Sequence, residues 1–139
     1  MADVFLSYCR DDQAIARHFA EGLEREGFAV WWDQALNAGE AFDQVTERAL
    51  DDARAVIVLW SRKSVESRWV RAEATQASLK NNMVPVMIQP CRRPIMFELT
   101  QTAELLDWNG DLSDLRWRSL VDSLRRMAAK TAAAQASPL

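Results

Sequence analysis

Short apolar runs alternate with amphipathic segments along most of the chain, and this alternation restricts its fold more than any other feature. The most strand-like run, residues 55–60, reads Ala-Val-Ile-Val-Leu-Trp and is rich in residue types favoured in buried strands. Between such runs, apolar residues recur at helical spacing, as Ile15, Phe19 and Leu23 do. Because successive parallel strands are joined by right-handed helical crossovers, the pattern predicts a parallel sheet with helices on both faces.

The expected elements define an α/β domain with a flavodoxin-like sheet of five parallel strands in the order 2-1-3-4-5. The strands are expected over residues 4–6, 28–32, 55–60, 83–88 and 104–108. The first helix should begin at a cap formed by Asp11 or Asp12 and end at Gly27. A polar loop, residues 33–41, is longer than most connections between a strand and a helix.

Three further helices are expected after this loop. One covers residues 42–52, one carries Trp69 and Glu73 and ends near residues 81–82, and the last covers residues 112–128. In the last helix, Leu115, Leu120 and Leu124 are expected to face the core. The tail from Lys130 is rich in Ala with Ser and Pro, so we expect one domain over residues 1–129 and a linker over residues 130–139.

The overall composition is that of an ordinary globular domain. The chain has 139 residues, of which 49% are apolar and 27% charged, and its formal net charge is -3, which argues against nucleic acid as a partner. The N-terminus lacks a basic signal-peptide region, and no apolar run is long enough to cross a bilayer. We therefore expect a cytoplasmic domain without membrane contact. Cys9, Cys91 and His18 do not form a common zinc pattern, so no metal is expected.

Several familiar chemistries lack their sequence signatures. Neither a GxGxxG turn nor a GxxxxGK[ST] loop occurs, which argues against a dinucleotide cradle and a P-loop. A phosphoacceptor receiver domain needs an Asp at the end of the third strand, where this chain has Trp60 and Ser61. Arg10 could lower the pKa of its neighbour Cys9, but a packing role for this thiol is the preferred interpretation.

A carboxylate beside an aromatic ring is the main candidate site. Residues at positions i and i+4 share one face of a helix, so Trp69 and Glu73 should project into the same space. The helical neighbours of Glu73 include Val70 and Gln76 but no cation, so a local ion pair is not expected. In open parallel sheets, ligands bind beyond the carboxyl ends of the strands where the strand order reverses, and this helix follows directly after that point. A merely solvated helix carboxylate remains the alternative.

Three groups of residues, in this order, carry a resemblance to a known family. The first box is Val4-Phe5-Leu6-Ser7-Tyr8 followed by acidic residues, and the second is residues 27–33 leading through Gly39 and Phe42 into the next helix. The third is residues 55–61 followed by Trp69 and Glu73 in a WxxxE pattern. From about residue 2 to residue 128, the chain resembles a Toll/interleukin receptor (TIR) domain of bacterial type.

The resemblance implies two alternative functions, since some members of this family cleave NAD and others are interaction modules. In the enzymatic group, the glutamate of the WxxxE helix is catalytic, which implies this role for Glu73. The residues that match the family's nucleotide pocket are Phe5, Ser7, Tyr8, Arg10, Trp32, Asp33, Phe42 and Trp69. NAD+ would be a substrate, and no bound cofactor is implied.

The resemblance also implies regulation by assembly. In the family, the loop that corresponds here to Asp33 through Phe42 packs against neighbouring subunits, so self-association should switch the activity on. The expected enzyme is a bacterial defence effector, with a fused or separate sensor domain, that releases nicotinamide and leaves ADP-ribose or a cyclised isomer. The alternative is a signalling adaptor or virulence mimic that binds other TIR domains without catalysis.

Overall fold

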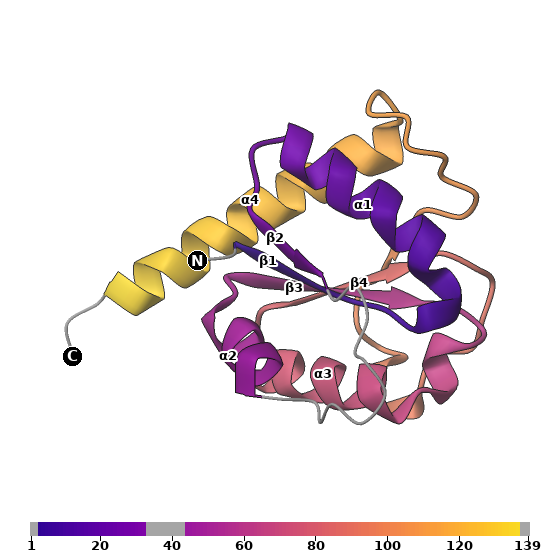
Figure 1. Ribbon diagram of the computed structural model, residues 1–139, viewed down its shortest axis with the longest axis horizontal. Helices are drawn as coiled ribbons and strands as arrows, with labels where there is room; N and C mark the ends of the chain where they lie inside the picture. The colour runs from indigo at the N-terminus through magenta and orange to yellow at the C-terminus, as the bar shows by residue number, and fades with distance from the viewer. Residues whose placement is uncertain (1–2, 33–43, 137–139) are drawn as a thin grey trace.

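A computed structural model describes residues 3–32 and 44–136, and its centre is a twisted sheet of parallel strands (Figure 1). The strands are β1 (Val4–Ser7), β2 (Val30–Trp32), β3 (Ala55–Trp60), β4 (Met83–Met87) and β5 (Ala103–Glu104). Their order is β2-β1-β3-β4-β5, and every neighbouring pair is parallel. The predicted flavodoxin-like order 2-1-3-4-5 is therefore confirmed.

Helices cover both faces of the sheet. The α-helices are α1 (Gln13–Arg25), α2 (Gln44–Asp52), α3 (Arg68–Leu79) and α4 (Leu115–Ala136), and the short 3-10 helices are η1 (Arg10–Asp12), η2 (Ser64–Glu66) and η3 (Ile95–Phe97). Figure 1 shows α1 and α4 on one face and α2 and α3 on the other. Within the described residues, no helix has the length and apolar character that a membrane span needs.

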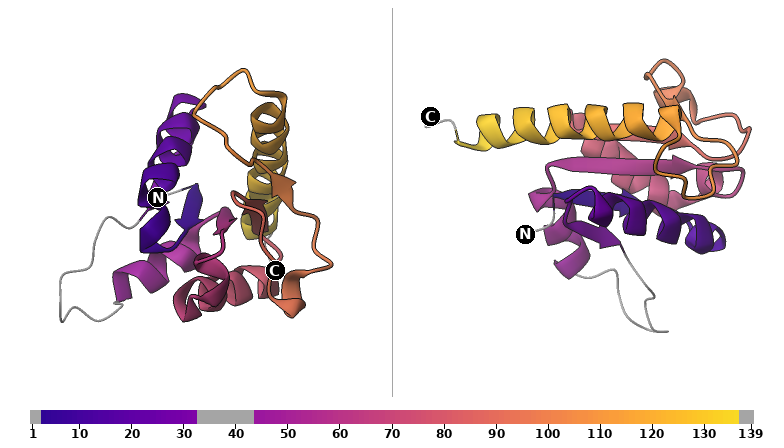
Figure 2. Two further views of the ribbon diagram at one scale, coloured as in Figure 1. Left: turned by 90° about the vertical axis from the view of Figure 1, so that its right-hand side faces the viewer. Right: turned by 90° about the horizontal axis from the view of Figure 1, so that it is seen from above.

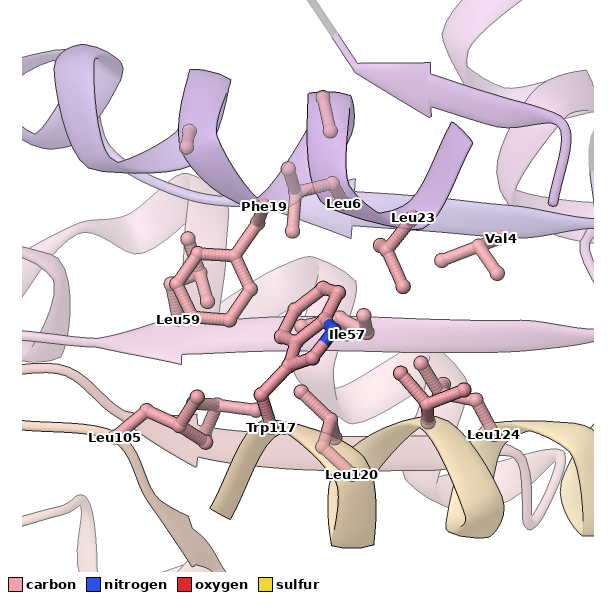
Figure 3. Close-up of a cluster of buried hydrophobic side chains, with 14 of the residues drawn as sticks. Val4, Leu6, Phe19, Leu23, Ile57, Leu59, Leu105, Trp117, Leu120 and Leu124 are labelled. Atoms are coloured by element: carbon pink, nitrogen blue, oxygen red, sulfur yellow. The ribbon is translucent and has the colours of Figure 1, made fainter. Parts of the chain in front are cut away.

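The two faces of the sheet belong to two separate hydrophobic cores. In β3, Ile57 and Leu59 point to the core beneath α1 and α4, which Figure 3 shows with Trp117 at its centre. Val58 and Trp60 point the opposite way, into the core beneath α2 and α3. Side chains alternate across a strand, and helices cover both faces here, which explains why residues 55–60 form an unbroken apolar run.

The same alternation sets the direction of the side chains at the end of β1. Val4 and Leu6 belong to the core beneath α1 and α4, whereas Phe5 belongs to the core beneath α2 and α3. Ser7 is two residues beyond Phe5, so its side chain shares the face that α3 covers.

Two helix ends show clear local stop and start signals, of which Gly27 was expected from the sequence. Gly27, just after α1, has a positive φ of 96°, a conformation that glycine adopts without a steric penalty. Ser67 caps α3, because its hydroxyl oxygen accepts a hydrogen bond from the backbone N–H of Val70 at 3.2 Å. Gly27 thus marks the end of α1, and Ser67 marks the start of α3.

The C-terminal third of the chain differs from the expectation at the fifth strand and in the last helix, which begins at Leu115 rather than at Leu112. The strand predicted over residues 104–108 is only Ala103–Glu104. A turn follows, in which the backbone N–H of Trp108 donates to the carbonyl of Leu105 and Asp107 has a φ of 58°, outside the range of an extended strand. Leu115 was predicted to face inward but is 84% exposed. The inward stripe begins at Trp117 and continues through Leu120 and Leu124, and Leu115 lies about 200° around the helix from Trp117.

Helix α4 also continues past residue 128, where we expected it to end, as far as Ala136. Figure 2 shows this part of the helix extending beyond the sheet. Residues 130–136 are helical because alanine is the strongest helix former and the segment is rich in it. The domain boundary at residue 129 stays a prediction.

Candidate active site

Glu73 lies on the core-facing side of α3 and only 5% of it is exposed. The hydroxyl of Ser7, at the end of β1, donates a hydrogen bond of 2.6 Å to Glu73 Oε1. The alternative of a merely solvated helix carboxylate is therefore wrong. A buried carboxylate is costly unless hydrogen bonds compensate for the lost water, and this short bond provides part of that compensation.

The sequence of α3 explains why this carboxylate faces inward. The buried residues of the helix are Val70, Glu73, Ala74 and Ala77, which recur at intervals of three and four residues and form one stripe. Two alanines in the stripe let the helix approach the sheet closely and leave room for a longer side chain. Glu73 is thus the polar member of an otherwise apolar stripe.

An open cavity of about 590 Å³ lies between α2 and α3, and Glu73 lines it. The lining residues come from these two helices: Glu47, Leu50, Asp51, Trp69, Ala72, Glu73, Thr75 and Gln76. Trp69 and Glu73 share this cavity, as their spacing predicts, and Trp69 is 39% exposed. The cavity has the size of a small-molecule site and combines an accessible aromatic ring with a buried carboxylate.

The cavity carries negative charge from both helices. Glu47 and Asp51 are one helical turn apart on α2 and lie across from Glu73. Lys80 forms an ion pair of 3.1 Å with Asp51, so part of the charge on α2 is compensated. Three carboxylates beside an aromatic ring favour the cationic part of a ligand over its anionic part.

A second buried carboxylate, Asp12, lies at the same end of the sheet. Its Oδ2 accepts hydrogen bonds from Ser61 Oγ at 2.5 Å and from Cys9 Sγ at 3.0 Å. We predicted Asp12 as a possible cap of the first helix, but its side chain makes no capping hydrogen bond. The carboxylate instead accepts hydrogen bonds from Ser61, which follows β3, and from Cys9, which follows β1. These bonds connect the ends of the two strands.

Cys9 is not an activated thiol. Burial, followed by the hydrogen bond to Asp12 and its negative charge, raises the pKa of Cys9 to about 11. The pKa shift is opposite to the lowering that the neighbouring Arg10 could cause, and Cys9 packs against the core beneath α2 and α3, as the packing interpretation expects. Burial also raises the pKa of Cys91, the other cysteine.

The remaining residues implied by the resemblance are distributed over both faces of the sheet. Phe5 is buried and stacks on Trp31 at 4.9 Å between ring centroids, on the same face as Glu73. Tyr8 and Trp32 form a ring pair at 6.2 Å and pack against the core beneath α1 and α4. Arg10 is exposed in η1. Asp33 and Phe42 lie outside the described residues.

The structure therefore brings together Ser7, Trp69 and Glu73 of the predicted residues. The α2 side of the cavity was not predicted from the sequence. Its signal was present, because Glu47 and Asp51 are four residues apart on an amphipathic helix and so share a face. Nothing in the sequence alone shows that this face lies opposite α3.

The strand order β2-β1-β3-β4-β5, with helices on both faces of the sheet, defines an α/β domain of the flavodoxin-like class. A family model described as a TIR domain matches residues 4–124, and the chain belongs to this family.

The individual relatives share only a low sequence identity with this chain. The chain is 33% identical over 73 residues, 51% of its length, to a protein of Bacteroides thetaiotaomicron named 2' cyclic ADP-D-ribose synthase BtTIR. The match spans only 25% of the length of that relative.

Two solved structures show the same fold at low identity. The TIR domain of the Toll-related receptor TRR-2 from Hydra magnipapillata superposes with a TM-score of 0.73 and 22% identity, over 90% of this chain and 99% of that one. The TIR domains of the activated Roq1 resistosome, which recognises the pathogen effector XopQ, give a TM-score of 0.53 and 21% identity over 91% of this chain and 84% of theirs.

Proposed function

We propose that this TIR domain is an NAD+ glycohydrolase in which Glu73 is the catalytic carboxylate. The observation that carries the proposal is the buried Glu73 side chain, held by Ser7 at 2.6 Å and lining the cavity that Trp69 shares. The name of the Bacteroides thetaiotaomicron relative, a cyclic ADP-ribose synthase, supports chemistry at an ADP-ribosyl group. Neither bound metal nor cofactor is required, since NAD+ is the substrate.

The reaction breaks the bond between the nicotinamide nitrogen and C1' of the ribose. The bonding electron pair stays on the nitrogen, so nicotinamide leaves as a neutral molecule and the ribose gains oxocarbenium character. A neutral leaving group needs no general acid, and one carboxylate is enough. Glu73 would stabilise the positive charge on the ribose and accept hydrogen bonds from its hydroxyl groups.

The second step decides the product. Attack by water at C1' gives ADP-ribose with loss of a proton, whereas attack by a nucleophile within the same molecule gives a cyclised isomer. Both reactions use the same first step and the same carboxylate. The proposal therefore covers either product.

The charge of the cavity suggests how NAD+ is oriented. Its pyridinium ring is cationic, and Trp69 offers an exposed indole face beside Glu73 and across from Glu47. The diphosphate is anionic and would be repelled by the carboxylates of α2. We therefore place the nicotinamide end between α2 and α3, with the diphosphate directed away from these helices.

Self-association is proposed as the activating step. The Roq1 TIR domains, which belong to an assembled resistosome, have the same fold. The proposed contact includes residues 33–42, which lie outside the described residues, so their part stays a prediction. A cytoplasmic role in bacterial antiviral defence, coupled to a fused or separate sensor, is likewise part of the proposal.

A second candidate function is a TIR–TIR interaction module without catalysis. The observation that favours it is an exposed apolar group in and just after η3, formed by Ile95, Met96 and Leu99. Exposed apolar side chains that gather in one segment are typical of protein interfaces. In that case Glu73 would serve only the packing of α3 on the sheet.

One experiment separates the two candidates. Purified protein is displayed at high density on beads or concentrated with a crowding agent, and NAD+ and nicotinamide are measured over time for wild type and Glu73→Ala. Loss of NAD+ with equal nicotinamide release in the wild type alone supports the enzyme. If the assembled wild type leaves NAD+ intact, the interaction module becomes the preferred function.

A further inference from the structure

Ser7 lies in a position that suits a support for Glu73 better than a direct contact with substrate. Its exposed fraction is 0%, and its hydroxyl donates to Glu73 Oε1 at 2.6 Å. A residue with no exposed surface acts on a ligand only through the group that it holds.

Strand β1, which ends with Ser7, is held on both sides by neighbouring strands. β1 pairs with β2 on one side and with β3 on the other, and Ser7 itself is in register with Val58. The serine side chain is short, so its oxygen has little freedom relative to this backbone. By contrast, Glu73 reaches the strand from α3 through three side-chain torsions. The hydroxyl of Ser7 therefore provides a fixed point for a flexible carboxylate.

Chemistry also favours a hydroxyl in this role. A lysine or arginine would hold the carboxylate equally well, but its positive charge would cancel the negative charge that stabilises an oxocarbenium ion. A serine hydroxyl orients the carboxylate without adding a formal charge. The pairing orients Glu73 without placing a positive charge beside it.

We propose that Ser7 is a positioning residue that fixes the Glu73 carboxylate and thereby sets kcat. The kinetic part of this inference rests on the proposed NAD+ glycohydrolase function, whereas the conformational part does not. A misplacement of about 1 Å at a reacting group can cost about a hundredfold in rate. Loss of the hydrogen bond should therefore lower kcat by about tenfold to a hundredfold and change KM by less than about twofold.

Ser61 offers a matched control. It also has an exposed fraction of 0%, it follows the neighbouring strand β3, and its hydroxyl also donates to a buried carboxylate. That carboxylate is Asp12, which does not line the cavity. Ser7→Ala and Ser61→Ala thus each remove a buried hydroxyl that donates to a carboxylate, and only the first removes a partner of Glu73. The Ser61 hydroxyl also accepts a hydrogen bond from the backbone N–H of Ser64, so its loss should affect stability at least as much.

Kinetics of the full chain under assembling conditions give the first test. We expect Ser7→Ala to reduce kcat with KM unchanged, and Ser61→Ala to keep wild-type kcat even if its melting temperature falls. Ser7→Thr retains the hydroxyl and should recover kcat to within about threefold of wild type. Equal kcat losses in Ser7→Ala and Ser61→Ala, or a loss seen only in KM, would overturn the positioning role.

A second measurement does not depend on catalysis. Three-bond scalar couplings of the Glu73 side chain, measured by NMR on the unassembled protein, report whether χ1 occupies one rotamer or several. A single rotamer is expected in wild type and Ser61→Ala, and averaging in Ser7→Ala. Unchanged couplings in Ser7→Ala would refute the proposal. An inactive wild type with the expected couplings would count against the enzyme function and leave the Ser7 contact supported.

Discussion

Replacing Glu73 with glutamine tests whether its charge, rather than its packing, matters for function. Glutamine has nearly the same shape and retains a side-chain oxygen that can accept the hydrogen bond from Ser7. The substitution also removes the cost of burying a charge. We therefore expect the free energy of unfolding to stay within about 1 kcal/mol of wild type.

The expected loss of activity follows from the charge that is removed. At a separation of about 4 Å and an effective dielectric constant of about 20, a carboxylate and a unit positive charge attract by about 4 kcal/mol. This energy corresponds to about a thousandfold in rate. NAD+ already carries a positive charge on its pyridinium ring before the reaction. Only the attraction that is gained as this charge moves toward the ribose in the transition state lowers the barrier. We expect a loss of about a hundredfold to a thousandfold in kcat.

The assay combines kinetics and unfolding on the same samples. Nicotinamide release is followed by chromatography for the assembled wild type, Glu73→Gln and Glu73→Ala, and urea unfolding is measured for each. Alanine leaves the buried Ser7 hydroxyl without this acceptor, so it should cost about 1–3 kcal/mol more stability than glutamine does. A stable Glu73→Gln variant with more than about a tenth of wild-type kcat would refute the electrostatic role.

Three further predictions concern the framework of the domain. In Gly22→Ala, the new Cβ would lie 2.9 Å from the ring of the buried Trp117. We expect urea unfolding to show a loss of about 1–3 kcal/mol in the free energy of unfolding, despite the better helix propensity of alanine. A gain in stability would contradict this packing. The hydrogen bond from Arg118 lowers the pKa of Glu26 in the folded protein. Its contribution to stability is therefore present above the unfolded pKa of about 4.3 and is lost as the pH falls through the folded value. Glu26→Gln should cost about 1 kcal/mol at pH 7 and almost nothing at a pH below that folded value, and equal costs at both pH values would show that the charge is not responsible. Because burial raises the pKa of Cys9 to about 11, iodoacetamide should modify Cys9 in the native protein at pH 8 far more slowly than in urea, and equal rates would contradict its burial.

The sequence predicted the fold well because both faces of the sheet are covered. Residues 55–60 form an apolar run that identifies a central strand without knowledge of its partners, and the helical spacing of Phe19 and Leu23 identifies α1. The errors occurred where local patterns are ambiguous. Leu115 has the residue type of a core position but lies off the inward stripe of α4. The fifth strand is replaced after Glu104 by a turn in which Asp107 has a positive φ.

The site could be predicted only in part, because its contacts join distant parts of the chain. The spacing of Trp69 and Glu73 correctly predicted that they share a cavity. The hydrogen bond between Ser7 and Glu73 joins residues 66 positions apart, and no local pattern indicates it. The cavity wall formed by Glu47 and Asp51 likewise depends on how α2 packs beside α3. Burial of Glu73 became visible only once β1 and α3 were placed against each other.

The most direct test of the central claim is a crystal structure of the assembled Glu73→Gln variant with intact NAD+. The account predicts that the nicotinamide ribose lies in the cavity between α2 and α3, next to residue 73, with the nicotinamide ring against Trp69 and the diphosphate directed away from Glu47. NAD+ bound elsewhere on the domain, or bound here with its ribose away from residue 73, would contradict the assignment of Glu73 as the catalytic carboxylate.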